Sequence, residues 1–252
     1  MSKWVDGFQR DASTDPMNSN VDTLSLSAAF RQHTATLHNQ AEKSGIVQDL
    51  LVGRITHSGY ALLIRNLLPA YDALEAGLSD RHAVPCFRRL ADPAVYRASA
   101  IRADLSALCG AGWSHTLPLL GAGREYAARI AAQAAGDGYG LIAHAYARYL
   151  GDLNGGQILK RLLTKSIGLT PETLTFYDFP DIPDLDAFKG DYRAAIDEAA
   201  HSIAAIEPVI EEAAMAFELN IQLFEAVKAA ASRETVAVPG AADNGAPAFG
   251  RA

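Results

Sequence analysis

Three glycines interrupt a stretch of sequence that otherwise predicts a helix. The segment "YLGDLNGGQILKRLL", which runs from Tyr149 to Leu163, contains Gly151, Gly155 and Gly156. Each glycine inside a helix costs about 1 kcal/mol relative to alanine, so the three together cost ~3 kcal/mol. That cost is a large share of the ~5–15 kcal/mol by which a native protein is stable. The segment must therefore gain something from a helix surface that carries no side chains.

Helical periodicity extends over most of the chain, and alternating apolar and polar residues are scarce. The pattern predicts helices near residues 24–44, 57–79, 96–109, 117–135, 138–168, 185–204 and 207–231. We expect Pro69 to bend the second helix and the Gly155–Gly156 pair to kink the fifth, because its apolar stripe changes phase there. The sequence predicts one all-α domain, residues 23–231, between a disordered N-terminal extension, residues 1–22, and a disordered C-terminal tail, residues 232–252.

Composition excludes several classes of protein. The chain has 22 basic and 29 acidic residues and a net charge of −7, which argues against a general nucleic-acid binder. Cys86 and Cys109 have neither metal-binding spacing nor the pattern of a disulfide framework, so a reducing cytoplasm is expected. We see no secretion signal, and no apolar run reaches the ~20 residues of a membrane span. The sequence therefore predicts a soluble cytoplasmic protein without a membrane anchor.

The first predicted helix carries a histidine beside its apolar stripe. Arg31 precedes His38 by seven residues and Glu42 follows it by four, so the three share one face. Glu42 can accept the proton of one ring nitrogen, which would fix the tautomer and leave the other nitrogen for a metal. A boundary histidine in a surface ion pair explains the same spacing, and the local pattern leaves both interpretations open.

Other polar residues allow similar pairs of interpretations. Gly151 and Gly155 share a face beside Asp152, which suits either a broad flat ligand or close packing of a second helix. Asn220 lies beside an apolar stripe and needs a hydrogen-bond partner, since an unmade buried hydrogen bond costs ~1–3 kcal/mol. Lys189 and Arg193 are one helical turn apart and present two positive charges together, to solvent or to an anionic ligand.

Four segments carry a resemblance to a known family. They read "TLHNQAEKS", "AHAYARYLGDLNGGQILKRLL", "FPDIPDLDAFKGDYR" and "FELNIQLFEAV". In this order and spacing they resemble the proximal-histidine segment, the signature segment, the propionate-binding stretch and the C-terminal helix of heme oxygenases. The resemblance extends from about Leu24 to Val227.

The resemblance implies an all-α fold that holds heme b between a proximal helix and a kinked distal helix. It also implies oxidative cleavage of heme to biliverdin, with release of CO and ferrous iron. His38 matches the proximal iron ligand, Asp152 the carboxylate that orders distal water, and Gly151 and Gly155 the backbone over the heme face. The other expected heme contacts are Arg31, Glu42, Tyr146, Gly156, Lys189, Arg193, Phe217 and Asn220. O2 and an electron donor, such as a ferredoxin or an NAD(P)H-dependent reductase, are the implied partners.

One departure from the family concerns the distal side. Leu68 and Leu119 stand where we align the distal tyrosines of mammalian members, so we expect a water network that is smaller or differently anchored. Two other functions compete with catalysis. A heme carrier or sensor could use the same pocket without turnover, although Asp152 in an intact glycine segment argues against storage alone. A di-iron oxidase needs two Glu-x-x-His motifs, and Glu198–His201 is the single one found.

Overall fold

The computed structural model describes residues 25–236, and this part of the chain is helical without a strand. The α-helices are α1 (Leu26–Glu42), α2 (Gly45–Leu51), α3 (His57–Ser79), α4 (Ala98–Cys109), α5 (Trp113–Thr116), α6 (Gly121–Ala135), α7 (Gly140–Ala145), α8 (Gly151–Ile167), α9 (Leu185–Ala199) and α10 (Glu207–Val236). Short 3₁₀ turns lie at Pro85–Phe87, Pro93–Val95, Pro171–Thr173, Thr175–Tyr177 and Ala200–Ser202. None of these helices is both long and apolar enough to cross a membrane.

The predicted all-α class is confirmed, and each of the seven predicted helices is present. The sequence missed α2 and α5, which are too short to show a clear period. α10 continues to Val236, five residues beyond its predicted end. The predicted N-terminal extension, residues 1–22, lies outside the described residues, as do residues 237–252 of the predicted tail.

Side chains at several helix ends explain where the helices begin and stop. The Thr56 hydroxyl accepts a hydrogen bond from the Gly59 amide at the start of α3, and Asp184 caps α9 in the same way. These caps satisfy amide groups that have no partner within the helix. α8 ends at Gly168, whose φ of 68° is the left-handed conformation that glycine adopts readily.

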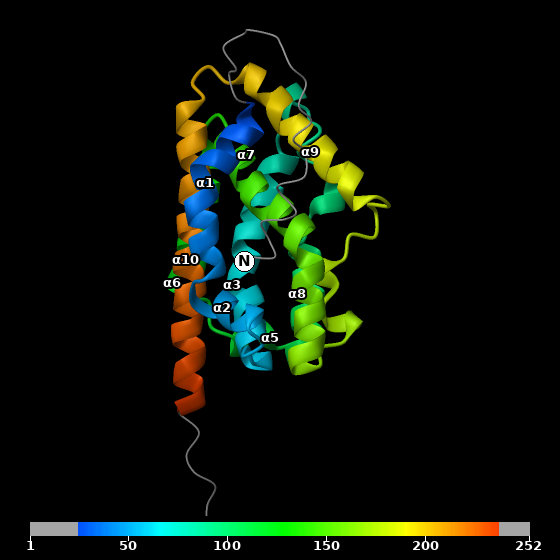
Figure 1. Ribbon diagram of the computed structural model, residues 1–252, viewed down its shortest axis with the longest axis vertical. Helices are drawn as coiled ribbons and strands as arrows, with labels where there is room; N and C mark the ends of the chain where they lie inside the picture. Colours follow the sequence, from blue (N-terminus) through cyan, green and yellow to red (C-terminus); the bar gives the residue numbers. More distant parts are fainter. Residues whose placement is uncertain (1–24, 237–252) are drawn as a thin grey trace, which may run out of the picture.

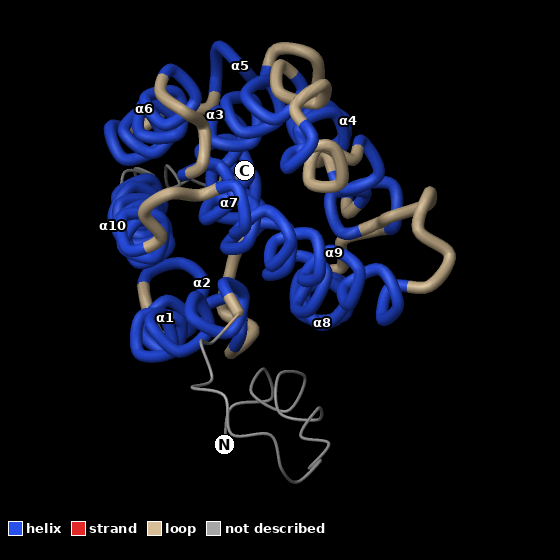
Figure 2. Tube along the Cα trace, turned by 90° about the horizontal axis from the view of Figure 1, so that it is seen from above, coloured by secondary structure: helices blue, strands red, loops and turns tan. Residues whose placement is uncertain are grey.

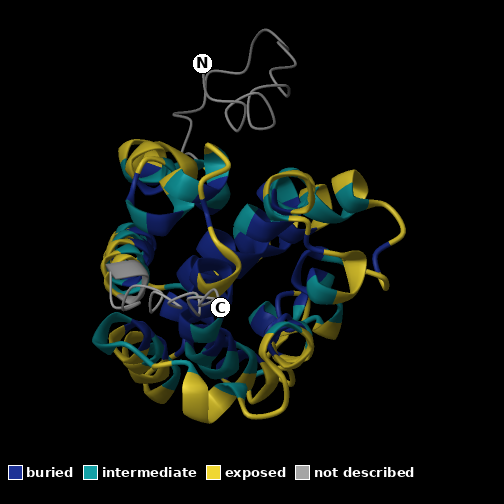
Figure 3. Cartoon of the chain, turned by 90° about the horizontal axis from the view of Figure 1, so that it is seen from below, coloured by how far each residue is buried: buried dark blue, intermediate teal, exposed yellow. Residues whose placement is uncertain are grey.

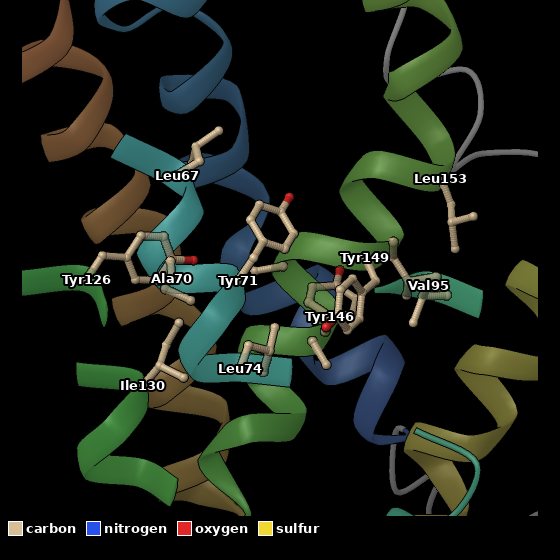
Figure 4. Packing of buried hydrophobic residues seen from close by; sticks show 14 of the residues in the cluster. Leu67, Ala70, Tyr71, Leu74, Val95, Tyr126, Ile130, Tyr146, Tyr149 and Leu153 are labelled. Atoms are coloured by element: carbon tan, nitrogen blue, oxygen red, sulfur yellow. The ribbon is translucent and has the colours of Figure 1, made fainter. Parts of the chain in front are cut away.

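α3 lies at the centre of the core. Fourteen of its residues are buried, and it packs against α4, α6, α7 and α10. Figure 2 shows α7 between α10 and α8, and Figure 3 shows that the buried residues gather in the middle of the molecule. Tyr71 and Leu74 of α3 meet Tyr126 and Ile130 of α6 and Tyr149 in this core (Figure 4).

One continuous helical path runs through the core and contains an irregular turn. All eleven residues from Gly140 to Leu150 are buried, and Tyr146–Leu150 form a π-helical turn between α7 and α8. The chain changes direction between α7 and α8 (Figure 1). The irregular turn precedes the Gly155–Gly156 pair at which the kink is predicted, and Gly151 to Ile167 form one continuous α-helix. A π turn inserts an extra residue, which also shifts the phase of an apolar stripe.

α2 is fixed to α10 by one close backbone contact and one ion pair. Gly45 begins α2 with a φ of 48°, and a Cβ there would lie 2.1 Å from the backbone carbonyl of Phe224. Asp49 forms an ion pair with Lys228 of α10, with Nζ and Oδ2 3.0 Å apart. These contacts determine where α2 lies, because nothing larger than glycine fits between the two backbones.

We predict that Gly45→Ala lowers the free energy of unfolding by about 2–4 kcal/mol, from the strained φ and the backbone overlap together. Gly190→Ala in α9 is the matched control, because no atom lies within 4 Å of its added Cβ. It should raise stability by about 1 kcal/mol. Urea unfolding followed by circular dichroism measures both changes. Equal stability of the two variants would contradict this account of the α2 contact.

Candidate active site

A cavity of about 140 Å³ opens between α1, α2, the π turn with α8, and α10. Most of its wall is apolar. α2 contributes Val47 and Leu51, and α10 contributes Phe224. Seven of the residues predicted from the sequence line it: His38, Glu42, Tyr146, Gly151, Asp152, Phe217 and Asn220.

His38 and Glu42 form the α1 wall of the cavity. The His38 Nδ1 atom lies 3.7 Å from Oε1 of Glu42, and the ring centroids of His38 and Phe217 are 5.8 Å apart. Burial lowers the pKa of His38, and the Glu42 carboxylate offsets only part of that effect. The imidazole is therefore neutral at pH 7, which is the form that binds a metal ion.

Asp152 lies on the opposite wall within a buried hydrogen-bond network. Its Oδ2 atom accepts a 2.5 Å hydrogen bond from the Tyr71 hydroxyl, and its Oδ1 atom lies 3.3 Å from Nη2 of Arg148. Arg148 also donates to the Tyr71 oxygen through Nε and Nη2, at 3.0 and 2.8 Å. Burial raises the pKa of Asp152, against the opposing effects of Arg148 and Tyr71. Burial likewise raises the pKa of Tyr71 well above its usual value.

The network continues into α10 and α6. Arg148 Nη1 donates a 2.5 Å hydrogen bond to Oδ1 of Asn220, and Nδ2 of Asn220 donates to the Tyr126 hydroxyl at 3.1 Å. Asn220 thus has the partner that its burial requires. Tyrosines at other positions anchor this network: Tyr71 and Tyr126 supply hydroxyl groups from α3 and α6 (Figure 4).

Leu68 and Leu119, on which the expectation of a smaller or differently anchored network was based, take no part in the network. Leu68 is buried in the core of α3, and Leu119 is half-buried just before α6.

The three glycines have different surroundings. Gly151 lines the cavity, and a Cβ added to it would meet no atom within 4 Å, so the backbone there faces open space. Gly155 is buried one turn later on the same face, between Gly151 and the cavity residue Leu159. Gly156 lies instead against Tyr177, whose ring would be 3.1 Å from an added Cβ. Close packing explains Gly156, whereas an open helix surface explains Gly151.

The predicted basic residues lie outside the cavity lining. Burial raises the pKa of the Tyr146 phenol, and the charges of Arg31 and Arg193 oppose that effect. Both arginines therefore lie near this cavity residue, one on α1 and one on α9. Lys189 is one turn before Arg193 and forms an ion pair with Asp186, at 2.5 Å. Arg31 and Arg193 therefore lie on the Tyr146 side of the site, and Lys189 is one turn from Arg193.

Local sequence patterns did not identify three members of the network. Arg148 was noticeable only as a charge within an otherwise apolar segment. Tyr71 and Tyr126 lie in strongly apolar helices, and they are 81 and 94 residues from their partners Asp152 and Asn220. No local signal marks such long-range pairs.

The walls of the cavity fit a flat apolar ligand that carries a metal ion. A neutral imidazole stands on α1, and a helix surface without a side chain at Gly151 stands on α8. Nowhere in the described part of the chain could a group of three or more His, Cys, Asp or Glu side chains hold a metal ion.

Comparison with known proteins identifies relatives of this chain. The model of the family described as heme oxygenase matches residues 24–226. Heme oxygenase 1 of Homo sapiens is 35% identical over 213 residues, which cover 83% of this chain and 74% of the human protein. Heme oxygenase 1 of Synechocystis is 33% identical over 202 residues, covering 80% and 84% of the two chains.

Solved structures show the same similarity. The crystal structure of Synechocystis heme oxygenase-1 in complex with heme superposes with a TM-score of 0.77 at 30% identity, covering 84% of this chain and 96% of that one. The structure of heme oxygenase from Leptospira interrogans gives a TM-score of 0.75 at 29% identity, covering 80% and 99%.

The partly buried His38 predicts a pH dependence of stability. Because its pKa is lower in the folded chain than in the unfolded one, the unfolded state binds the proton more readily. This contribution to stability is complete above about pH 6.5 and is lost as the pH falls below that value. We expect the free energy of unfolding of the wild type, relative to His38→Gln, to decrease between pH 7.5 and 5.5. Urea unfolding at several pH values measures it, and a constant difference would show that burial does not shift this histidine.

Proposed function

Because the chain belongs to the heme oxygenase family, we propose that it binds heme in the cavity between α1 and α8 and cleaves it oxidatively to biliverdin, CO and ferrous iron. The protein is an oxidoreductase that degrades heme. Besides this membership, the observation that carries the proposal is the pair of facing walls, with neutral His38 on one and the Asp152 network on the other.

His38 is the residue that would ligate the iron. Bound heme supplies the iron that activates O2 and the ring carbon that is oxidised. The neutral imidazole donates less electron density than a thiolate, and so does less to promote O–O cleavage. Glu42, 3.7 Å from Nδ1, orients the ring without a short hydrogen bond that would make the ligand strongly anionic.

Asp152 would hold water on the side of the cavity across from His38. Each of its carboxylate oxygens accepts one hydrogen bond from the protein and keeps a second lone pair. A water held there can donate to the substrate side of the cavity, while Tyr71 and Arg148 keep the carboxylate in place. The open backbone at Gly151, with Gly155 one turn later, leaves room for this water and for a broad ligand.

The remaining predicted contacts would orient the heme in its plane. Arg31, Lys189 and Arg193 suit the propionates, because charge-assisted hydrogen bonds to carboxylates contribute roughly 1.5–3 kcal/mol when partly buried. Tyr146 lies beside two of these cations, and Phe217 packs near the His38 ring. Gly156 acts through packing against Tyr177, outside the heme contact itself.

The electrons come from an external donor, for which a ferredoxin or an NAD(P)H-dependent reductase is the proposed class. We place the reaction in the cytoplasm, where both donors occur. The two cysteines, which form no disulfide, support a reducing compartment.

Reduction of the heme complex in air tests the function against a carrier or sensor. An oxygenase loses the Soret band and forms the biliverdin spectrum, with CO released. A carrier holds its heme unchanged under the same conditions, and that outcome would overturn the proposal.

His38→Ala should still bind some heme, through burial of the ring and the propionate contacts, but it should lose turnover. Added imidazole should restore part of the activity, because it can occupy the position of the missing ligand. Absorption spectra and biliverdin yield measure both effects. His33→Ala, an exposed position on the same helix, is the control. An unchanged spectrum and full activity in His38→Ala would assign the iron to another histidine.

Asp152→Ala should reduce the biliverdin yield by about 100-fold and increase peroxidase activity, because no acceptor remains to hold the water. It should also lower the free energy of unfolding by ~3 kcal/mol, since Arg148 loses its carboxylate partner. Asp152→Asn keeps one acceptor oxygen and should be milder in both respects. Product spectra with hydrogen peroxide, and with reductant plus O2, separate the two activities. A normal biliverdin yield from Asp152→Ala would exclude this role.

A further inference from the structure

Asp104 of α4 is a buried carboxylate that the reaction as described above does not use. It is 0% exposed, and none of the ion pairs within residues 25–236 includes it. Its two oxygens accept three hydrogen bonds from a single segment: from the Thr175 amide at 2.9 Å, the Thr175 hydroxyl at 2.6 Å and the Phe176 amide at 2.9 Å. Burying a carboxylate without a cation is costly, so packing alone does not account for this residue.

The segment that Asp104 holds is the 3₁₀ turn Thr175–Tyr177, and Phe176 in this turn packs on Tyr71. The two ring centroids are 5.6 Å apart and the planes meet at 79°, so the contact is edge to face. The guanidinium of Arg148 lies 5.1 Å from the centroid of the same Tyr71 ring. The phenol that donates to Asp152 is thus confined by both neighbours.

The same turn also holds α8. The Tyr177 ring fills the space beside Gly156, and the Tyr177 carbonyl accepts a 2.8 Å hydrogen bond from Nε2 of Gln157. Tyr71 belongs to α3 and Asp152 to α8, so their hydrogen bond joins two separate helices. The Thr175–Tyr177 turn contacts both of these helices.

We propose that Asp104 and Phe176 are positioning residues for the reaction, and that they hold the Tyr71 phenol against the Asp152 carboxylate. The inference rests on the proposed function, in which Asp152 orders water at the reacting oxygen. Asp104 fixes the backbone of the turn, the turn places Phe176, and Phe176 prevents the Tyr71 ring from tilting away. Neither residue lines the cavity, so both act through Tyr71.

The test compares two core substitutions of the same kind in the full-length chain. Phe176→Leu removes the ring that faces Tyr71. Phe87→Leu is the matched control, because Phe87 is also fully buried and stacks on another tyrosine, Tyr139, at 6.0 Å. Two readouts are needed: the ¹³C NMR signal of the Tyr71 ring carbon bonded to oxygen, and the ratio of biliverdin formation to peroxidase activity after loading with hemin.

We expect both variants to lose similar thermal stability. Only Phe176→Leu should shift the Tyr71 signal and lower the biliverdin-to-peroxidase ratio, by at least about threefold. In a Tyr71→Phe background, Phe176→Leu should cause no further change in that ratio, because residues that act through one another are not additive. Asp104→Asn should change both readouts in the same direction. If the amide oxygen keeps both hydrogen bonds from Thr175, the amide NH2 group faces the Phe176 N–H, so two donors meet.

Equal ratios for the two leucine variants would overturn the inference, as would an undiminished effect of Phe176→Leu in the Tyr71→Phe background. If Phe176→Leu does not fold, Asp104→Asn decides by the same readouts. If the wild type forms no biliverdin, the proposed function fails. The Tyr71 signal then still decides whether Phe176 positions the phenol.

Discussion

The guanidinium of Arg148 is the group on which the architecture of this site depends. It lies in a helical turn whose five residues are all buried, so its charge has to be satisfied by other parts of the protein. Its acceptors are Tyr71 of α3, Asp152 of α8 and Asn220 of α10. One charge therefore holds three helices in a fixed relation. Burial disfavours the cation, but Tyr71 and Asp152 outweigh that effect and raise the pKa of Arg148, so it remains charged.

The backbone around Arg148 brings this network to the cavity wall. Arg148 lies in the π turn and Asp152 in the first turn of α8, so their ion pair spans the junction between the two helical geometries. Gly151 lies at that junction and leaves the helix surface open towards the cavity. The junction therefore brings the open backbone of Gly151 and the Arg148–Asp152 pair to the same wall of the cavity.

Much of the fold followed from the sequence, because long amphipathic helices have a strong period. The site was only partly predictable. His38 with Glu42, and Asp152 with Gly151, lie close together in the chain, so helical spacing placed each pair on one wall. Tyr71, by contrast, lies in a helix that is apolar on nearly every side, and its partner is 81 residues away. Asp104 shows the same difficulty, because its hydrogen bonds reach a turn 71 and 72 residues later.

The two walls of the cavity hold their titratable groups in different ways. On α1, burial favours the neutral form of His38, and the half-buried Glu42 lies too far away for a short hydrogen bond to reverse this. On α8, burial raises the pKa of Asp152 despite the opposing effects of Arg148 and Tyr71, whose hydrogen bonds hold the carboxyl group in place. The α1 wall thus offers a lone pair, whereas the α8 wall offers an acceptor whose position is fixed by three helices. A ligand between them meets a metal-binding nitrogen on one face and an ordered polar network on the other.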